Sequence, residues 1–236
     1  MPYSSSDSHI GVTVENVDGR TVTPSRRLAI HYNHIETGRA ARVATATFTP
    51  PDAIKMGGYS LYASPTLYSG HIVHGHIVAD RHNGRCVECR IFVRHYGPDD
   101  RLAMLYGPMM AMSPGSDFHV DWKIPDTRGY PIAEIGIVLT SEIRADGTVY
   151  LHFLDWADTP DVRLTRTEGG SMWRSAWVDG FDHFQGGSVE EPYRLIQDEG
   201  TGLLIQGCRG WRDYAVSAPV TPHMAVSAGI AACVQG

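Results

Sequence analysis

The chain has 236 residues, with 26 Asp and Glu side chains against 20 Lys and Arg, which gives a formal net charge of -6. Hydrophobic residues make up 42%, which is enough to build a core and too much for a disordered chain. The acidic balance argues against a nucleic-acid partner, which needs clustered Lys and Arg. Apolar runs are far shorter than the roughly 20 residues of a membrane-spanning helix, so no membrane association is expected.

The beginning of the chain, MPYSSSDSH, has no basic start followed by an apolar stretch. A secretory signal is therefore not expected. The four cysteines are too few and too scattered for a disulfide scaffold. Both observations predict a cytoplasmic protein with reduced thiols.

Short runs with strand-like alternation follow one another along the chain. Residues 11–23 are expected to form a β-hairpin that turns at Asp18-Gly19. Alternation with a period of two then predicts half-buried strands, each bounded by turn residues. These strands are expected at 42–49, 71–80, 87–96 and 147–156.

The last of these runs, GTVYLHFLDW, has aromatic residues on both of its expected faces. Alternation places Val149, Leu151 and Phe153 on the core face. The opposite face is expected to carry Tyr150, His152, Leu154 and Trp156.

Long helical periodicity is missing from the sequence. Residues 171–181, with Trp173 and Trp177 four positions apart, are the one place where a helical turn or two is expected. The fold class predicted is all-β, with sheet stacked on sheet. The stretch TRTEGGS at 165–171 predicts a boundary between a first and a second set of strands.

The run HIVHGHIVAD contains several histidines, a residue type that commonly binds metal ions. On a strand, His74 and His76 point to one face about 7 Å apart, and His71 lies close in sequence. A zinc site needs three or four ligands, and no acidic ligand stands beside them in this run. The favoured interpretation is an exposed polar strand face, so no metal site or cofactor is predicted. His74 and His76 stay weak candidates, and a structural calcium ion stays open.

Aromatic residues outside the expected core suggest a ligand-binding surface. Sugar rings stack their apolar C–H faces on aromatic rings, while their hydroxyl groups need polar neighbours. The competing interpretation is that the aromatics pack in cores or between domains, where aromatic residues dominate. The candidate ligand-binding residues are Tyr150, Asp155, Trp156, Trp122 and Trp211.

Several strings together resemble one protein family. They are GYSLYASPTLYSGHIV, RHYGPDD, IPDTRGYPIAEIGIVL, GTVYLHFLDW, WRSAWVDGFD and the long run from Tyr193 to the end. The chain from about residue 57 resembles the C-terminal, non-catalytic region of bacterial ADP-ribosylglycohydrolase family proteins. The resemblance implies a galactose-binding-like β-sandwich at 57–166 and a partial concanavalin-like or laminin-G-like jelly roll at 172–236. Residues 1–56 are then an N-terminal extension with a hairpin that joins the first sandwich.

The sequence also departs from that family. The family's helical catalytic domain, with its magnesium-binding Thr-Asp-Asp and Asp-x-Asp-Thr motifs, has no counterpart here, so no catalytic residue is carried over. The second jelly roll is short, and relatives continue beyond the string that ends VQG. The resemblance therefore implies a truncated second sandwich. Residues 229–235 are expected to form an edge strand, which favours a homodimer through the unfinished sheet.

Three functional hypotheses follow. The first is a non-catalytic accessory module that binds carbohydrate or an ADP-ribose-like ligand, or that docks a catalytic domain. The second is a sugar-processing hydrolase or lyase with a His and acid site around His71–His76, which requires a histidine to meet Asp or Glu in a concave pocket. The third is a truncated structural or assembly fragment.

Overall fold

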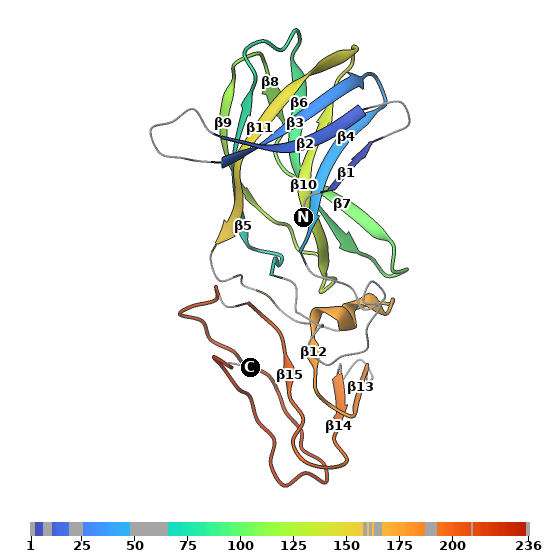
Figure 1. Ribbon diagram of the computed structural model, residues 1–236. Helices are drawn as coiled ribbons and strands as arrows, with labels where there is room; N and C mark the ends of the chain where they lie inside the picture. The colour runs from blue at the N-terminus through green and yellow to red at the C-terminus, as the bar shows by residue number, and fades with distance from the viewer. Residues whose placement is uncertain are drawn as a thin grey trace.

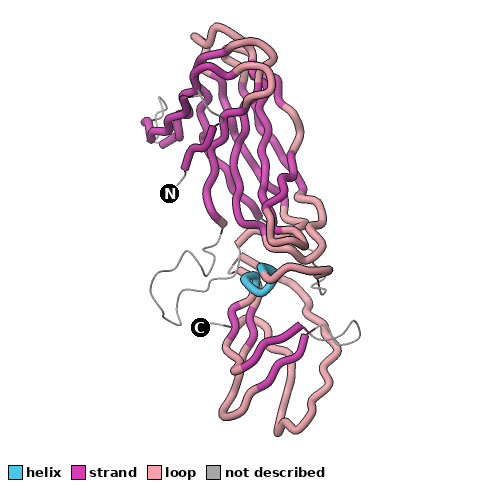
Figure 2. The backbone as a smooth tube through the Cα atoms, turned by 90° about the vertical axis from the view of Figure 1, so that its right-hand side faces the viewer, coloured by secondary structure: helices cyan, strands magenta, loops and turns pink. Residues whose placement is uncertain are grey.

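The structure is a computed structural model that describes residues 3–6, 11–18, 26–47, 66–157, 160, 162, 167–186, 193–208 and 210–234. Two regions follow one another along the chain (Figure 1). A β-sandwich ends with β11, and a C-terminal region with short strands and long connections lies at one end of it. A short helix lies between them (Figure 2). The predicted all-β class is confirmed.

The first sheet of the sandwich is antiparallel with strand order β1-β4-β10-β6-β7, and β8 also pairs with β6. Its strands are β1 (Tyr3–Ser6), β4 (Ala40–Ala46), β6 (Val87–Tyr96), β7 (Leu102–Tyr106), β8 (Met110–Met112) and β10 (Ile132–Thr140).

The second sheet is also antiparallel, with strand order β2-β3-β11-β5-β9. Its strands are β2 (Gly11–Asp18), β3 (Arg26–Ile35), β5 (Ile72–Ala79), β9 (Asp117–Lys123) and β11 (Ala145–Ala157). The long strand β11 lies at the centre, so its side chains have neighbours on both sides.

One apolar layer holds the two sheets together. Ile30 and Ile77 come from the second sheet, Ile91 and Ile137 come from the first, and all four are essentially inaccessible to solvent. Burying an aliphatic side chain of this size contributes about 1.5–3 kcal/mol. Alternate residues of each strand therefore face inward, and those between them face outward.

Several of the predicted strands are confirmed, with small shifts at their ends. β4, β5, β6 and β11 occupy the expected runs, and β2 is the first arm of the expected hairpin. β2 pairs with β3, and the expected second arm lies in residues 19–25, which are outside the described part of the chain. Residues 3–46 contribute strands to both sheets, so this stretch is part of the sandwich itself. The boundary expected at residue 57 lies outside the described residues.

The C-terminal region contains a short helix and four short strands among its described residues. The helix is the 3-10 helix η2 (Met172–Ala176), which confirms the helical turn expected there. β12 (Val178–Asp179) pairs with β15 (Leu204–Ile205), and β13 (His183–Gly186) pairs with β14 (Tyr193–Ile196). These strands form two separate two-stranded sheets. No helix of the described chain has the length and apolarity to cross a membrane.

The edge strand expected at 229–235 was wrong for its described residues, because 229–234 contain no strand. Cys233 has φ +54°, which is incompatible with extended backbone. Its N–H donates to the hydroxyl of Tyr214 at 3.0 Å instead of to a neighbouring strand. The expected homodimer therefore has no edge strand at 229–234 through which to form. Self-association stays a prediction.

Asp100 joins the sandwich to the C-terminal region. Its carboxylate accepts hydrogen bonds from the backbone N–H groups of Ser171 and Met172 at 2.8 and 2.9 Å, and from the Ser171 hydroxyl at 2.8 Å. Burial raises the pKa of Asp100, but these hydrogen bonds outweigh it and leave that pKa below its ordinary value. Nearby, Gly207 donates its N–H to the hydroxyl of Tyr68. The start of η2 is thus anchored by a carboxylate of the sandwich.

The central strand β10 approaches β4 closely at Gly136, which predicts a strong effect of any side chain there. A Cβ atom on Gly136 would lie 2.1 Å from the Val43 carbonyl oxygen and 2.8 Å from the Ala44 Cα. We expect Gly136→Ala to lower the free energy of unfolding by roughly 1–3 kcal/mol, the usual range for overpacking. Urea unfolding followed by tryptophan fluorescence measures this change.

Gly84→Ala is the matched control, because a Cβ atom there meets nothing within 4 Å. Its unfolding midpoint should stay close to that of the wild type. Equal midpoints for Gly136→Ala and the wild type would contradict the observed approach of β10 to β4.

Candidate functional site

The outer face of the second sheet gathers five of the twelve histidines of the chain. They alternate with residues that the core buries: Val73, Gly75 and Ile77 on β5, and Val120 and Trp122 on β9. We call this surface the histidine face. Its histidines are His31 on β3, His74 and His76 on β5, His119 on β9, and His152 on β11.

Three of these rings form a stack across three neighbouring strands. The ring centroids of His76 and His119 are 4.0 Å apart with planes inclined by 16°, and those of His76 and His152 are 4.4 Å apart with planes inclined by 26°. Because β9 and β11 flank β5, His119 and His152 cover the two sides of the His76 ring. Burial lowers the pKa of His152, and the neighbouring His76 and Arg27 lower it further. The His152 ring is therefore mainly neutral at pH 7.

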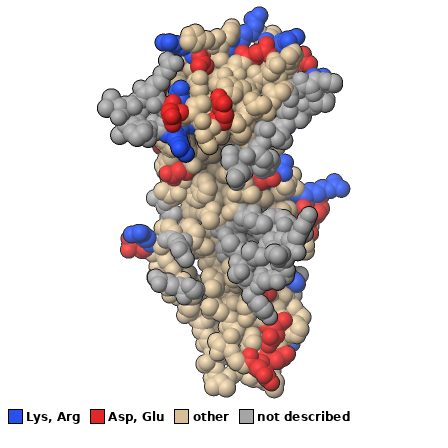
Figure 3. All heavy atoms as spheres, in the orientation of Figure 1, with Lys and Arg blue, Asp and Glu red and all other residues tan. Residues whose placement is uncertain are grey.

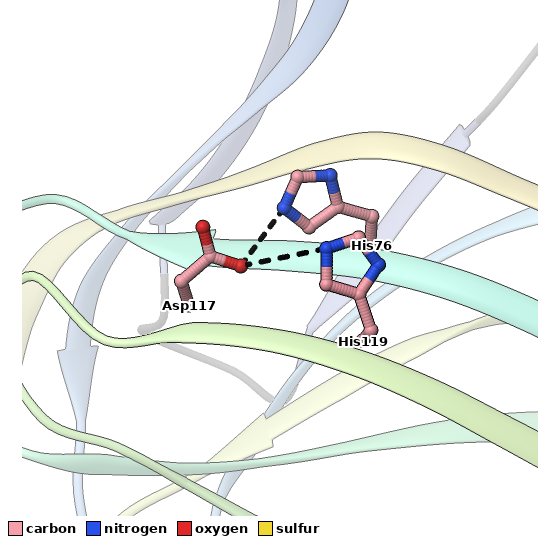
Figure 4. Close-up of side chains that lie close together, drawn as sticks. All are labelled: His76, Asp117 and His119. Atoms are coloured by element: carbon pink, nitrogen blue, oxygen red, sulfur yellow. Dashed lines mark hydrogen bonds and ion pairs between the residues drawn. The ribbon is translucent and has the colours of Figure 1, made fainter.

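Asp117 lies beside the nitrogen-bearing edges of two of these rings, His76 and His119 (Figure 4). Its Oδ1 atom is 2.9 Å from Nε2 of His76 and 4.0 Å from Nε2 of His119. The potential ligand atoms of these three side chains lie within 4.8 Å of one another. Within the described chain, this is the only such group of three His, Cys, Asp or Glu side chains found. Two imidazoles and one carboxylate suit a transition metal better than the all-oxygen preference of calcium.

Acidic partners also accompany His74 and His31 on this face. Asp121 accepts a hydrogen bond from Nδ1 of His74 at 2.6 Å, and Glu15 lies 3.1 Å from Nε2 of His31. The run of β5 itself contains no acidic residue. The acids come from β9 and β2, which the sheet order places beside the histidines. The alternation of DFHVD at 117–121 was the signal available in the sequence, but it did not reveal which strand lies next to β9.

His71 lies away from the histidine face. It is almost completely buried, and its Nδ1 accepts a hydrogen bond from the backbone N–H of Tyr68 at 3.0 Å. His74 and His76 do meet acids, but Asp117 and Asp121 are largely exposed to solvent. A general acid or base is usually tuned by burial in a cleft. The geometry therefore gives no support to the hydrolase or lyase hypothesis around His71–His76.

A register shift in β11 rearranges the aromatic residues of this strand. β11 and β5 pair Leu151 with Ile77 and then Phe153 with His76, so His152 is an extra residue in the ladder. Beyond this β-bulge the faces exchange. Leu154 and Trp156 pack against the core, whereas Phe153 is 44% exposed. The expectation that Tyr150 and Trp156 share one outer face was wrong for this reason.

Tyr150 stays on the outer face and is held by two charged neighbours. Its hydroxyl donates to Asp80 Oδ2 at 2.7 Å, and the Arg27 guanidinium lies 3.8 Å from its ring centroid. The backbone N–H of His82 and then the Tyr150 hydroxyl lower the pKa of Asp80 below its ordinary value, against the smaller opposing effect of burial. Tyr150 is thus a fixed, half-buried ring at one side of the histidine face.

The remaining predicted ligand residues occupy three different surroundings. Trp122 faces the core with only 7% of its surface exposed, and Gly107 packs against its ring. Trp211 lies in the C-terminal region, with its ring centroid 5.0 Å from that of Tyr68 at the junction of the two regions. Asp155 is exposed and pairs with His74 across β11 and β5. The structure therefore brings Tyr150 and Asp155 to the histidine face and places Trp122, Trp156 and Trp211 elsewhere.

Surface charge does not single out another site on the face drawn in Figure 3. Acidic and basic side chains are intermixed over the sandwich, and acidic side chains gather at the far end of the C-terminal region. This view shows no continuous basic surface among the described residues. The charges on this face thus agree with the acidic composition of the chain.

No protein-family model matches this chain, and no curated protein matches it either. Several solved structures are similar to this chain, among them carbohydrate-binding modules and the enzymatically active domain of a bacteriophage tailspike protein. A carbohydrate-binding module of the β-sandwich superfamily shares 14% identity over 66% of this chain and 56% of its own, with a TM-score of 0.48. The match thus spans just over half the length of that protein.

Two further carbohydrate-binding modules match the chain with similarly low identity over the same share of its length. A module that recognises mannan is 14% identical over 66% of this chain and 86% of its own, with a TM-score of 0.40. A family 11 module from Clostridium thermocellum, solved with a β-1,3-1,4-mixed-linked tetrasaccharide, is 12% identical over 66% and 87%, with a TM-score of 0.38. Identities this low identify no binding residue in this chain.

The hydrogen bond from Tyr150 to Asp80 predicts a pH-dependent effect of Tyr150→Phe. This change keeps the ring beneath Arg27 but removes the hydroxyl, and we expect it to cost roughly 1–2 kcal/mol of unfolding free energy at pH 7. The folded pKa of Asp80 lies below the reference value of 3.8. The stabilisation is therefore full above pH 3.8 and is lost as the pH falls through the folded pKa.

Denaturant unfolding at several pH values measures the effect, and Tyr106→Phe is the control. Tyr106 is an exposed residue of the first sheet whose hydroxyl contacts only the Met104 sulfur in the described structure. A cost of Tyr150→Phe that stays constant down to acidic pH would show that the hydroxyl does not act through the Asp80 carboxylate.

Proposed function

We propose that this protein is a carbohydrate-binding accessory module and that the histidine face is its binding surface. The observation that carries the proposal is the exposed ring of Phe153, which is surrounded by polar groups on one sheet face. Its centroid lies 5.8 Å from that of His76 and 6.3 Å from that of His119. An apolar ring bordered by a few hydrogen-bonding groups is the pattern that a sugar, with its C–H face and its hydroxyls, requires.

The polar groups lie on both sides of that ring. Asp155 is exposed beyond Phe153 on the same strand, and His74 and Asp121 lie next to it on β5 and β9. On the other side, Arg27 and Tyr150 present a guanidinium group and an aromatic edge. Backbone pairing fixes all of these positions, so a ligand would meet a preformed surface. The carbohydrate-binding modules with similar folds support this proposal at the level of fold.

A narrower form of the proposal names the kind of catalytic domain beside which this module acts. The strings shared with the non-catalytic region of ADP-ribosylglycohydrolase family proteins support a role beside such a catalytic domain. In that case the ligand is ADP-ribose, whose ribose rings and phosphates could use the same histidines and Arg27. This narrower form rests on the sequence resemblance alone.

Isothermal titration calorimetry with a ligand panel tests the proposal. The panel contains soluble xylo-, manno- and mixed-linked gluco-oligosaccharides, with ADP-ribose as a separate arm. We expect at least one oligosaccharide to bind, and Phe153→Ala to weaken its binding by about tenfold, or 1.4 kcal/mol. Asp155→Asn should weaken it in the same direction through a lost hydrogen-bond acceptor.

Tyr106→Ala provides the control on the opposite sheet, because Tyr106 is also a substantially exposed aromatic residue. This variant should bind as the wild type does. Absence of binding to every oligosaccharide would refute carbohydrate recognition, and binding of ADP-ribose alone would favour the narrower form. Equal losses in Phe153→Ala and Tyr106→Ala would refute the histidine face as the site.

A further inference from the structure

We infer that His76, Asp117 and His119 form a binding site for a divalent transition metal ion of the zinc class. The three side chains come from two neighbouring strands, β5 and β9, and point to the same face of the sheet (Figure 4). The inference rests on their ligand atoms and is independent of carbohydrate binding.

The distances between the ligand atoms are close to those of a metal site. A tetrahedral ion with bonds of 2.0–2.1 Å holds its ligand atoms about 3.3 Å apart. Here Oδ1 of Asp117 is 2.9 Å from His76 Nε2 and 4.0 Å from His119 Nε2, and no pair exceeds 4.8 Å. Because an imidazole binds an ion in its own ring plane, coordination also requires the stacked His76 and His119 rings to rotate until both nitrogens point at the ion.

The strand register places the three side chains next to one another before any ion binds. His76 and His119 are directly opposite each other in the hydrogen-bonded ladder, and Asp117 lies two residues before His119 on the same face. Preorganisation of this kind is what a binding site on rigid strands provides.

The chemistry of the ligands selects the class of ion. Imidazole nitrogen suits zinc, copper and nickel, whereas calcium and magnesium prefer oxygen ligands. The carboxylate adds the negative charge that a site with two neutral imidazoles would lack. With the His119 and Asp117 side chains 70% and 58% exposed, solvent can supply the remaining ligand or ligands.

The alternative interpretation is that these side chains form ordinary surface ion pairs, which contribute about 0–1 kcal/mol. The chain contains an internal comparison for this alternative. His74 and Asp121 lie on the same two strands and the same face, and their atoms are 2.6 Å apart. That pair has a nitrogen and an oxygen but is not part of a described group of three ligands.

The test uses the full chain, without a histidine tag and freed of metal by a chelator. Isothermal titration with Zn²⁺ is expected to give one site per chain, and Co²⁺ is expected to produce visible absorption bands of a low-coordinate nitrogen and oxygen site. His119→Ala and Asp117→Asn should each weaken Zn²⁺ binding by at least about tenfold, since even changes beyond the direct ligands have effects of this size. Circular dichroism confirms that both variants keep the β fold.

His74→Ala and Asp121→Asn are the matched controls and should change the Zn²⁺ affinity by less than about twofold. The inference is overturned if the wild type binds neither Zn²⁺ nor Co²⁺. It is also overturned if His119→Ala binds Zn²⁺ as well as the wild type, or if the control variants lose as much affinity as the ligand variants. Loss confined to the His119 and Asp117 variants supports it.

Discussion

The apolar layer between the two sheets determines which side chains the sandwich displays. Each strand of the second sheet places Val, Ile, Leu or Trp side chains in this layer, and the residues between them must then face outward. Val73 and Ile77 thereby turn His74 and His76 outward, and Val120 and Trp122 do the same for His119 and Asp121. Burial of each of these side chains contributes about 1.5–3 kcal/mol. The apolar residues therefore determine which face of each strand is buried, and the polar residues lie on the opposite face. The histidine face is a consequence of how the core packs.

Within that frame, the bulge in β11 decides which aromatic residue reaches the surface. Without the extra residue at His152, Phe153 would lie in the core and Trp156 outside. With it, Phe153 is exposed beside His76, while Trp156 packs against the core and donates its indole N–H to the Thr66 carbonyl at 2.9 Å. The same irregularity brings His152 against His76. Bulges often lie next to functional sites because they redirect side chains in this way.

Much of the sandwich was accessible from the sequence, because fully buried and less buried residues alternate along β5 and along the first half of β6. β10 was less visible, since it packs on both faces and reads as an almost unbroken apolar run. The site was less accessible than the fold. The meeting of His76 with Asp117 and His119 depends on β5 and β9 being neighbours, and Asp117 follows His76 by 41 positions in the sequence. Neither this sheet order nor the bulge in β11 leaves a local signal.

We propose that the outer face of the second sheet binds the ligand, with Phe153 at the centre of the contact. The most direct measurement is the mapping of NMR chemical-shift changes on addition of an oligosaccharide that binds. The largest changes are expected on the outward residues of β5, β9 and β11, including His119, Phe153 and Asp155. Changes concentrated on the first sheet, or around Trp211 and the C-terminal region, would contradict it.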